Sequence, residues 1–274
     1  MKPKFLNLGC LVLCLTFSFT LQSQNALEHG RTAFYNISIG AIGGGVGAIF
    51  NRPDGEKIGS AFLRGMWKGA AGGAVIYGSK FAVRGLYKRN NTSFLWTSKI
   101  INSVGTSMVE NAALNRNLFE TLHINIGFSR VQFYLKDKFK VQHRIILVPM
   151  LGFAVKLGQG KFDLKRSAES LTFVFVDNNS QFSSTYTPNS IYLDGNGIDN
   201  DYHNEVIRSF QYTNFYFINN CLHKWRESRI EKQGKIVLLD KIFYSDVFST
   251  LFYEVYENRN NYLRNEANYF SNRF

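Results

Sequence analysis

Two glycine-rich apolar stretches, ISIGAIGGGVGAIF (residues 37–50) and AFLRGMWKGAAGGAVIYG (residues 61–78), decide how the N-terminal third of this chain folds. The segment NRPDGEK (residues 51–57) separates them and combines Asn, Pro, Asp and Gly, the residue types that favour a tight turn. We therefore expect a hairpin of two helices within residues 30–92.

Glycines in this hairpin recur at four-residue intervals, at Gly40 and Gly44 in the first stretch and at Gly65, Gly69 and Gly73 in the second. Small residues at this spacing share one helix face and let two backbones approach closely, as helices do in lipid. The glycines follow no strand and form no phosphate-binding loop motif, so we expect no nucleotide.

Two interpretations of the hairpin stay open. The helices pack tightly against each other or against the rest of the protein, or the hairpin lies at or in a membrane surface. The first stretch has 14 residues, fewer than the ~20 that span a bilayer. We favour the membrane surface, with the basic residues of the region near lipid headgroups. These residues are Arg64, Lys68, Lys80, Arg84, Lys88 and Arg89.

Residues 1–24 have the order of a secretory signal peptide. Lys2 and Lys4 precede an apolar run over residues 8–19, and polar residues follow. Cleavage near Ser23 or Gln24 leaves a single cysteine, Cys221, and therefore no intramolecular disulfide. We expect an exported protein of the bacterial periplasm or of an envelope membrane.

The composition narrows the class of partner. A hydrophobic share of 45% and an aromatic share of 15% exclude a disordered chain. Lys and Arg (32) exceed Asp and Glu (20) by 12, which favours anionic partners. The basic residues are dispersed without a nucleic-acid-binding motif, and export removes most access to nucleic acid. We therefore expect an anionic membrane surface or an envelope protein as partner, and no nucleic acid.

Residues 93–274 predict a second, α+β domain. A helix is expected over residues 93–115, and three or four antiparallel strands follow from residue 119, where apolar and β-branched residues alternate. A short strand at residues 190–193 precedes a helix that begins at about Asp201. The expected fold class is therefore α+β, with the helical hairpin first, an antiparallel sheet in the middle and helices at the end.

One of the C-terminal helices carries the segment NEVIRSFQY, from Asn204 to Tyr212, which resembles the H-E-x-x-H-x-x-Q-Y helix of zincin-type metallopeptidases. The resemblance implies a zincin-like fold in which the strand over residues 190–193 is an edge strand that pairs with substrate. It also implies a third metal ligand from a later helix, where the segment NYLRNEANYF has Glu266 at the ligand position.

Both zinc-ligating histidines of the family motif are replaced in this chain. Asn204 and Arg208 occupy their positions, and Arg cannot release a proton to bind a metal. Glu205 then has no metal-bound water to activate and is a vestigial catalytic residue. We expect no metal or other cofactor, and we predict that Arg208 lies between Glu205 and Glu266 as a cation in place of the metal.

The favoured function is a non-catalytic binding or structural module of the envelope, a pseudoenzyme with a zincin-like fold. Two alternatives stay open: an active metallopeptidase with an altered zinc site, and a purely membrane-structural protein.

Overall fold

The computed structural model describes residues 24–89, 91–136, 138–177, 185–194, 198–221, 242–259 and 262–271. The expected signal peptide lies outside these residues apart from Gln24, at which the first described helix begins. The described residues contain both helices and strands, and the strands form small sheets. The predicted α+β class is therefore confirmed.

The secondary structure follows the chain in this order. The helices are α2 (Gln24–Phe50), α3 (Ile58–Lys88), the short 3-10 helix η1 (Thr92–Phe94), α4 (Leu95–Ala113), α5 (Leu147–Leu157), α6 (Leu164–Ser170), α7 (Ile198–Asn214), α8 (Phe217–Cys221), α11 (Val247–Arg259) and α12 (Tyr262–Phe270). The strands are β1 (Thr121–Ile126), β2 (Ser129–Tyr134), β3 (Lys140–Ile146), β4 (Lys161–Phe162), β5 (Phe173–Asp177), β6 (Thr185–Thr187), β7 (Ser190–Asp194) and β8 (Phe243–Tyr244).

Helices α2 and α3 are antiparallel and approach each other through glycines. A Cβ atom at Gly69 would lie 2.0 Å from the Gly40 carbonyl oxygen, and one at Gly44 would lie 2.5 Å from the Gly65 carbonyl oxygen. The third helix, α4, joins them in the same way, because a Cβ at Gly72 would lie 2.8 Å from the Gly105 carbonyl oxygen. These backbones are in contact, and a side chain at any of these positions would separate the helices.

Both helices of this hairpin extend beyond the apolar stretches that predict them. α2 begins at Gln24 and α3 continues to Lys88. The added turns carry polar side chains that find partners inside the protein; Asn36 and Lys80, for example, are buried. Apolar periodicity alone does not reveal such turns, because their stability comes from tertiary contacts.

The predicted antiparallel sheet is wrong in two respects. The described residues form two mixed sheets, with strand orders β1-β2-β3-β8 and β4-β5-β7-β6, in which the pairs β3/β8 and β5/β7 are parallel. The strand over residues 190–193, predicted as an edge strand, is part of β7 and lies between β5 and β6. β7 therefore has no free edge along which a substrate peptide would pair.

Part of the predicted strand region is helical. Residues 147–157 form α5, whose first turn is held by a distant side chain: the Asp246 carboxylate accepts a hydrogen bond from the Val148 N–H at 3.0 Å. This contact satisfies one of the donors that a helix start leaves open. Pro149 fits the same turn because a first-turn residue needs no N–H.

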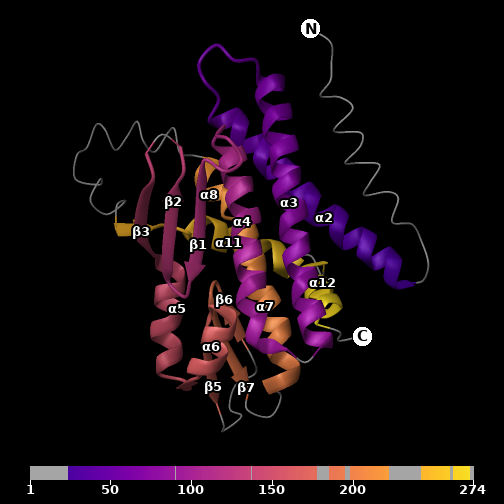
Figure 1. Ribbon diagram of the computed structural model, residues 1–274, viewed down its shortest axis with the longest axis vertical. Coiled ribbons are helices and arrows are strands. Elements are labelled where there is room, and N and C mark those ends of the chain that lie inside the picture. Colours follow the sequence, from indigo (N-terminus) through magenta and orange to yellow (C-terminus); the bar gives the residue numbers. More distant parts are fainter. Residues whose placement is uncertain are drawn as a thin grey trace.

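Helix α7 packs against α3, α4 and α12 and against the strands β6 and β7. Figure 1 shows α3 and α4 alongside each other, with β1–β3 beside α4 and with α7 next to the strands β5–β7. Its apolar side packs into a core shared with α3, α4, the second sheet and α12. That core includes Val83, Leu95, Val174, Ile191, Val206, Phe210, Ala267 and Phe270.

Candidate functional site

The two segments on which the predicted zincin resemblance depends, on α7 and α12, lie side by side and run antiparallel. The Asn204 side chain donates hydrogen bonds to Asn268 (3.0 Å) and Ser271 (3.2 Å) at the end of α12. Two turns further along α7, the Gln211 amide donates to the Glu266 carboxylate at 2.7 Å. Glu266 therefore lies beside Gln211, and the ligand-like positions 204 and 266 contact different residues.

Glu266 is completely enclosed, with 1% of its side chain exposed, and its counter-ion is Lys80 of α3. The Lys80 ammonium lies 2.6 Å from Glu266 Oε2 and also donates to Asn36 Oδ1 at 2.8 Å. Asn36 of α2 donates to the same carboxylate. Four helices, α2, α3, α7 and α12, thus meet at one buried ion pair.

Of the predicted Glu205–Arg208–Glu266 cluster, the contact between Arg208 and Glu205 is present, and the prediction that Glu266 joins it is wrong. Arg208 forms its closest ion pair with Glu257 of α11, lies 3.9 Å from Glu205, and stacks over the Tyr186 ring at 4.0 Å. Among the described residues no ion pair joins Arg208 to Glu266. The reason is the direction of the side chains: Arg208 faces α11 and β6, whereas Glu266 faces α3, which already supplies a cation.

Glu205 is buried beside two cations. Burial raises its pKa to about 7, against the opposing charges of Arg208 and Lys156. Lys156 of α5 donates to the Ser190 carbonyl oxygen at 2.9 Å, and burial lowers its pKa to about 7. With 3% of Glu205 exposed, no substrate reaches this carboxylate in the described structure.

Sequence reasoning missed the lysines around α7. Lys80, Lys99 and Lys156 come from three different helices, and each is at most 4% exposed. Lys99 donates to Asn189 and lies 5.0 Å from the centre of the Phe210 ring. Of these three lysines, only Lys80 belongs to the set predicted to lie near lipid headgroups, and only its pairing with Glu266 across the fold shows that it faces inward.

Metal ligands are not grouped in the described part of the chain: no three His, Cys, Asp or Glu side chains come together there. His203 packs against the rings of Tyr87 and Tyr202, with centroids 4.4 Å and 5.5 Å away. The absence of a bound metal stays a prediction. Cys221 is partly buried, and burial raises the pKa of its thiol to about 11, which does not suit a nucleophile.

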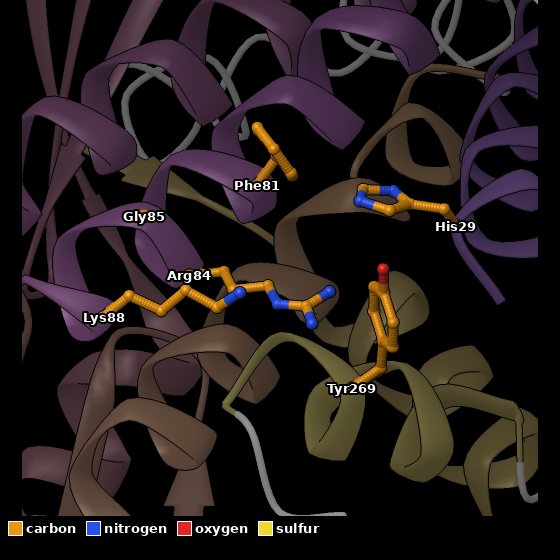
Figure 2. A pocket seen from close by; sticks show the side chains of 6 residues that line it. All are labelled: His29, Phe81, Arg84, Gly85, Lys88 and Tyr269. Atoms are coloured by element: carbon orange, nitrogen blue, oxygen red, sulfur yellow. The ribbon is translucent and has the colours of Figure 1, made fainter. Parts of the chain in front are cut away.

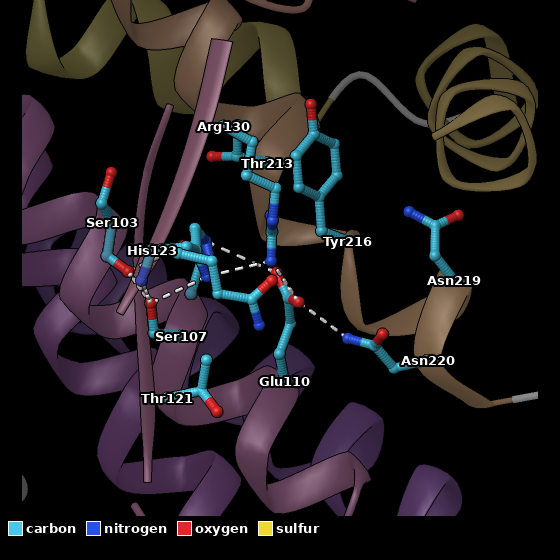
Figure 3. Close-up of polar contacts among 12 residues, drawn as sticks. Ser103, Ser107, Glu110, Thr121, His123, Arg130, Thr213, Tyr216, Asn219 and Asn220 are labelled. Atoms are coloured by element: carbon cyan, nitrogen blue, oxygen red, sulfur yellow. Dashed lines mark hydrogen bonds and ion pairs between the residues drawn. The ribbon is translucent and has the colours of Figure 1, made fainter. Parts of the chain in front are cut away.

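A second polar cluster, between α4 and the first sheet, has the residue types of a catalytic triad (Figure 3). Ser107 Oγ lies 2.9 Å from His123 Nδ1, and His123 Nε2 lies 3.5 Å from Glu110 Oε1. All three are buried, and the Ser107 hydroxyl already donates to the Ser103 carbonyl oxygen at 2.6 Å. Burial and the Arg130 charge lower the pKa of His123 to about 3, so it does not act as a base near neutral pH.

The faces of α2 and α3 that carry the closely packed glycines are buried between the helices, and the opposite faces are exposed. Between residues 61 and 84 of α3 the exposed residues follow one stripe, which we call the outer stripe: Leu63, Trp67, Ala74, Gly78 and Phe81. On α2 the most exposed apolar residues are Phe34 and Ile42, at 68% and 60%. No charged residue occurs between Arg31 and Arg52.

Three of the charged residues of α3 turn away from this stripe. Arg64 pairs with Glu56 and donates to Asn115 Oδ1 at 2.6 Å, and Lys68 donates to the Arg116 carbonyl oxygen at 2.7 Å. Lys80 is enclosed, as described above. The prediction that Lys80 lies near lipid headgroups is therefore wrong, and an uncharged outer stripe remains.

A pocket of about 310 Å³ lies where α2 begins and α3 and α12 end (Figure 2). Its lining comes from these three helices and comprises His29, Phe81, Arg84, Gly85, Lys88 and Tyr269. Only the fold brings these residues together, because His29, Phe81 and Tyr269 are far apart in the chain.

Comparison with known proteins adds no relative. No model of a protein family matches the chain, no curated protein matches it, and no solved structure matches its fold.

Proposed function

We propose that this chain is a non-catalytic protein of the bacterial envelope that lies on a membrane surface through the outer faces of α2 and α3. One observation carries the proposal: the outer stripe is apolar and exposed, while Arg64 and Lys80 of the same helix are paired with glutamates away from it. A contiguous exposed apolar surface of this kind marks an interaction site.

Lipid is the occupant that fits this surface. Leu63 and Phe81 are 18 residues apart, so the outer stripe is ~27 Å long at ~1.5 Å per residue. Basic residues follow beyond both ends of the hairpin, with Arg52 and Lys57 at the turn and Lys88 and Arg89 at the end of α3. Basic residues near the ends of an exposed apolar face suit an anionic membrane surface, which attracts Lys and Arg side chains close to it.

The inner side of the hairpin favours a surface position over a crossing. One stretch of the described helices, Glu28–Phe50, is long and apolar enough to cross a membrane, and 39% of its most apolar window is buried in the protein. It packs on α3 and α4, and its inner face carries buried Thr32 and Asn36. Lying flat keeps these contacts and exposes only the outer face to lipid.

Replacing Leu63 and Trp67 together by glutamine is expected to weaken vesicle binding about tenfold or more, because two half-exposed apolar side chains no longer enter the lipid. Co-sedimentation of the purified protein with phospholipid vesicles measures this. The matched control replaces Leu151 and Val155, each 61% exposed on α5, by glutamine. An equal loss in both variants, or no vesicle binding by the unaltered protein, would contradict the proposal.

The non-catalytic part of the proposal rests on Glu266. Its carboxylate is already neutralised by Lys80, and the other ligand-like positions carry Asn204 and Arg208. A working peptidase would need this carboxylate, or another ligand set, to hold a metal.

Metal content separates the two functions. We expect the purified protein to retain only substoichiometric zinc after incubation with Zn²⁺ and dialysis, as measured by elemental analysis. Stoichiometric zinc that is lost in Glu266→Ala and kept in Glu254→Ala, an exposed glutamate on α11, would favour the metallopeptidase alternative.

A further inference from the structure

The pocket shown in Figure 2 combines permanent cations with aromatic walls. Arg84 and Lys88 are four residues apart on α3 and therefore share a helix face. The Arg84 guanidinium lies 4.2 Å from the centre of the Tyr269 ring, and the His29 ring lies 5.2 Å from Phe81 and 5.4 Å from Tyr269. None of the six described lining residues is acidic.

The pocket continues the outer stripe. Phe81 belongs to both, and the exposed residues Gly85 and Lys88 follow it on the same face of α3. A Cβ atom at Gly85 would meet nothing within 4 Å, so the pocket is open on this side. A ligand seated here would meet two cations and three aromatic rings at one end and the apolar stripe at the other.

We infer that this pocket holds the phosphate of an anionic phospholipid headgroup, one without a cation of its own, with the acyl chains along the outer stripe. Arg84 and Lys88 supply the positive charge that a phosphate ester requires, and guanidinium groups pair with phosphate oxygens through parallel hydrogen bonds. The rings of Phe81 and Tyr269 face the apolar part of the ligand. The inference rests on the proposed membrane association and adds a headgroup site to it.

His29 reports on the occupancy of the pocket. Burial, Arg84 and Lys88 lower its pKa below the ordinary value. A bound phosphate places negative charge beside the imidazole and offsets the two cations, so the His29 pKa rises when the site is filled. An anionic membrane surface by itself also raises the pKa of a nearby imidazole, so the rise that identifies the site is the part that depends on Arg84 and Lys88.

The experiment follows the His29 ring by NMR across pH with vesicles of phosphatidylcholine, with vesicles that also contain phosphatidylglycerol, and with soluble glycerol phosphate alone. His29→Gln assigns the signal. We expect the pKa of His29 to rise only with phosphatidylglycerol vesicles, and vesicle binding to fall about tenfold in Arg84→Gln/Lys88→Gln.

The matched control is Lys57→Gln/Arg89→Gln, which removes the same charge from the same hairpin outside the pocket lining. It is expected to keep the rise in His29 pKa, whereas the pocket variant loses it. Lys88→Gln alone, on an exposed residue, keeps the test valid if removal of the Arg84 contact with Tyr269 disturbs folding.

The outcomes distinguish a failure of the headgroup site from a failure of the proposed membrane association. Equal binding to both kinds of vesicle with an unchanged His29 would overturn the headgroup site and leave membrane association standing. A rise in His29 pKa with soluble glycerol phosphate alone would assign the pocket to a free phosphate ester and overturn the lipid assignment. No binding to either kind of vesicle would overturn both.

Discussion

Replacing Lys80 by methionine is expected to lower the free energy of unfolding by about 3–5 kcal/mol at neutral pH, because it leaves the Glu266 carboxylate buried without a counter-ion. Both side chains are 1% exposed, so water does not compensate the lost charge. Methionine nearly keeps the volume of lysine, and the loss therefore reports on charge more than on packing. Urea denaturation of the purified variant measures the change.

Two further variants test the cause of this loss. Lys88→Met removes a charge from an exposed site on the same helix and is expected to change the free energy of unfolding by no more than about 0.5 kcal/mol. The double variant Lys80→Met/Glu266→Leu removes both charges and is expected to be more stable than Lys80→Met alone. If Lys80→Met lowers the free energy of unfolding no more than Lys88→Met does, the buried pair does not stabilise the junction of the four helices.

Arg130→Met is expected to cost about 3–5 kcal/mol at neutral pH, since it removes one partner of the other buried ion pair. Arg130 Nη2 lies 2.7 Å from Glu110 Oε2, and the guanidinium lies 4.1 Å from the centre of the Tyr244 ring. Arg130 and Glu110 come from β2 and α4, so this pair joins the first sheet to the helices (Figure 3).

The pH dependence of this loss follows from Glu110. Burial alone would raise the pKa of Glu110, but Arg130, His123 and hydrogen bonds from Asn220 and Arg130 hold it below the ordinary value. The pair therefore stabilises the fold above the pKa of an unfolded glutamate, ~4.3, and this stability is lost as the pH falls through the lower pKa of the folded state. Without Arg130 the Glu110 pKa rises, so the variant is least stable relative to the unaltered protein at neutral pH.

Urea denaturation at pH 7 and at about pH 4 is expected to show a smaller difference between Arg130→Met and the unaltered protein at the lower pH. Arg116→Met is the control, because Arg116 is 3.9 Å from Glu120 in a partly exposed pair, which contributes about 0–1 kcal/mol. A difference that is constant with pH would show that Arg130 acts through packing on Tyr244 and not through its charge.

The elements that are predicted correctly from the sequence are those with a clear local pattern of apolar residues. The helix at α4 and the helix at α7 follow apolar periodicity, and the strands β1 to β3 follow alternation of apolar residues. The prediction fails at residues 147–157, where an apolar run is compatible with strand or helix. There the Asp246 carboxylate, nearly a hundred residues away, accepts a hydrogen bond from the Val148 N–H and stabilises the first turn of the helix.

The candidate sites depend on pairings that no local pattern contains. The sequence places Glu205 and Arg208 one turn apart, and they do meet, at 3.9 Å. It does not show that Arg208 faces Glu257 or that Lys80 reaches Glu266, 186 residues further along the chain. A buried charge needs an opposite charge within contact distance, and the choice of partner depends on which helices pack together.

The sequence by itself therefore determined the α+β class and the positions of small residues at which helices can approach. Both follow from properties of neighbouring residues: the period of apolar side chains and the absence of a Cβ at positions such as Gly40 and Gly69. Only the tertiary structure decided which way the charges of α3 face. Lys80 turns inward because α12 brings a carboxylate to it, and this leaves an uncharged outer stripe that ends at a basic, aromatic pocket.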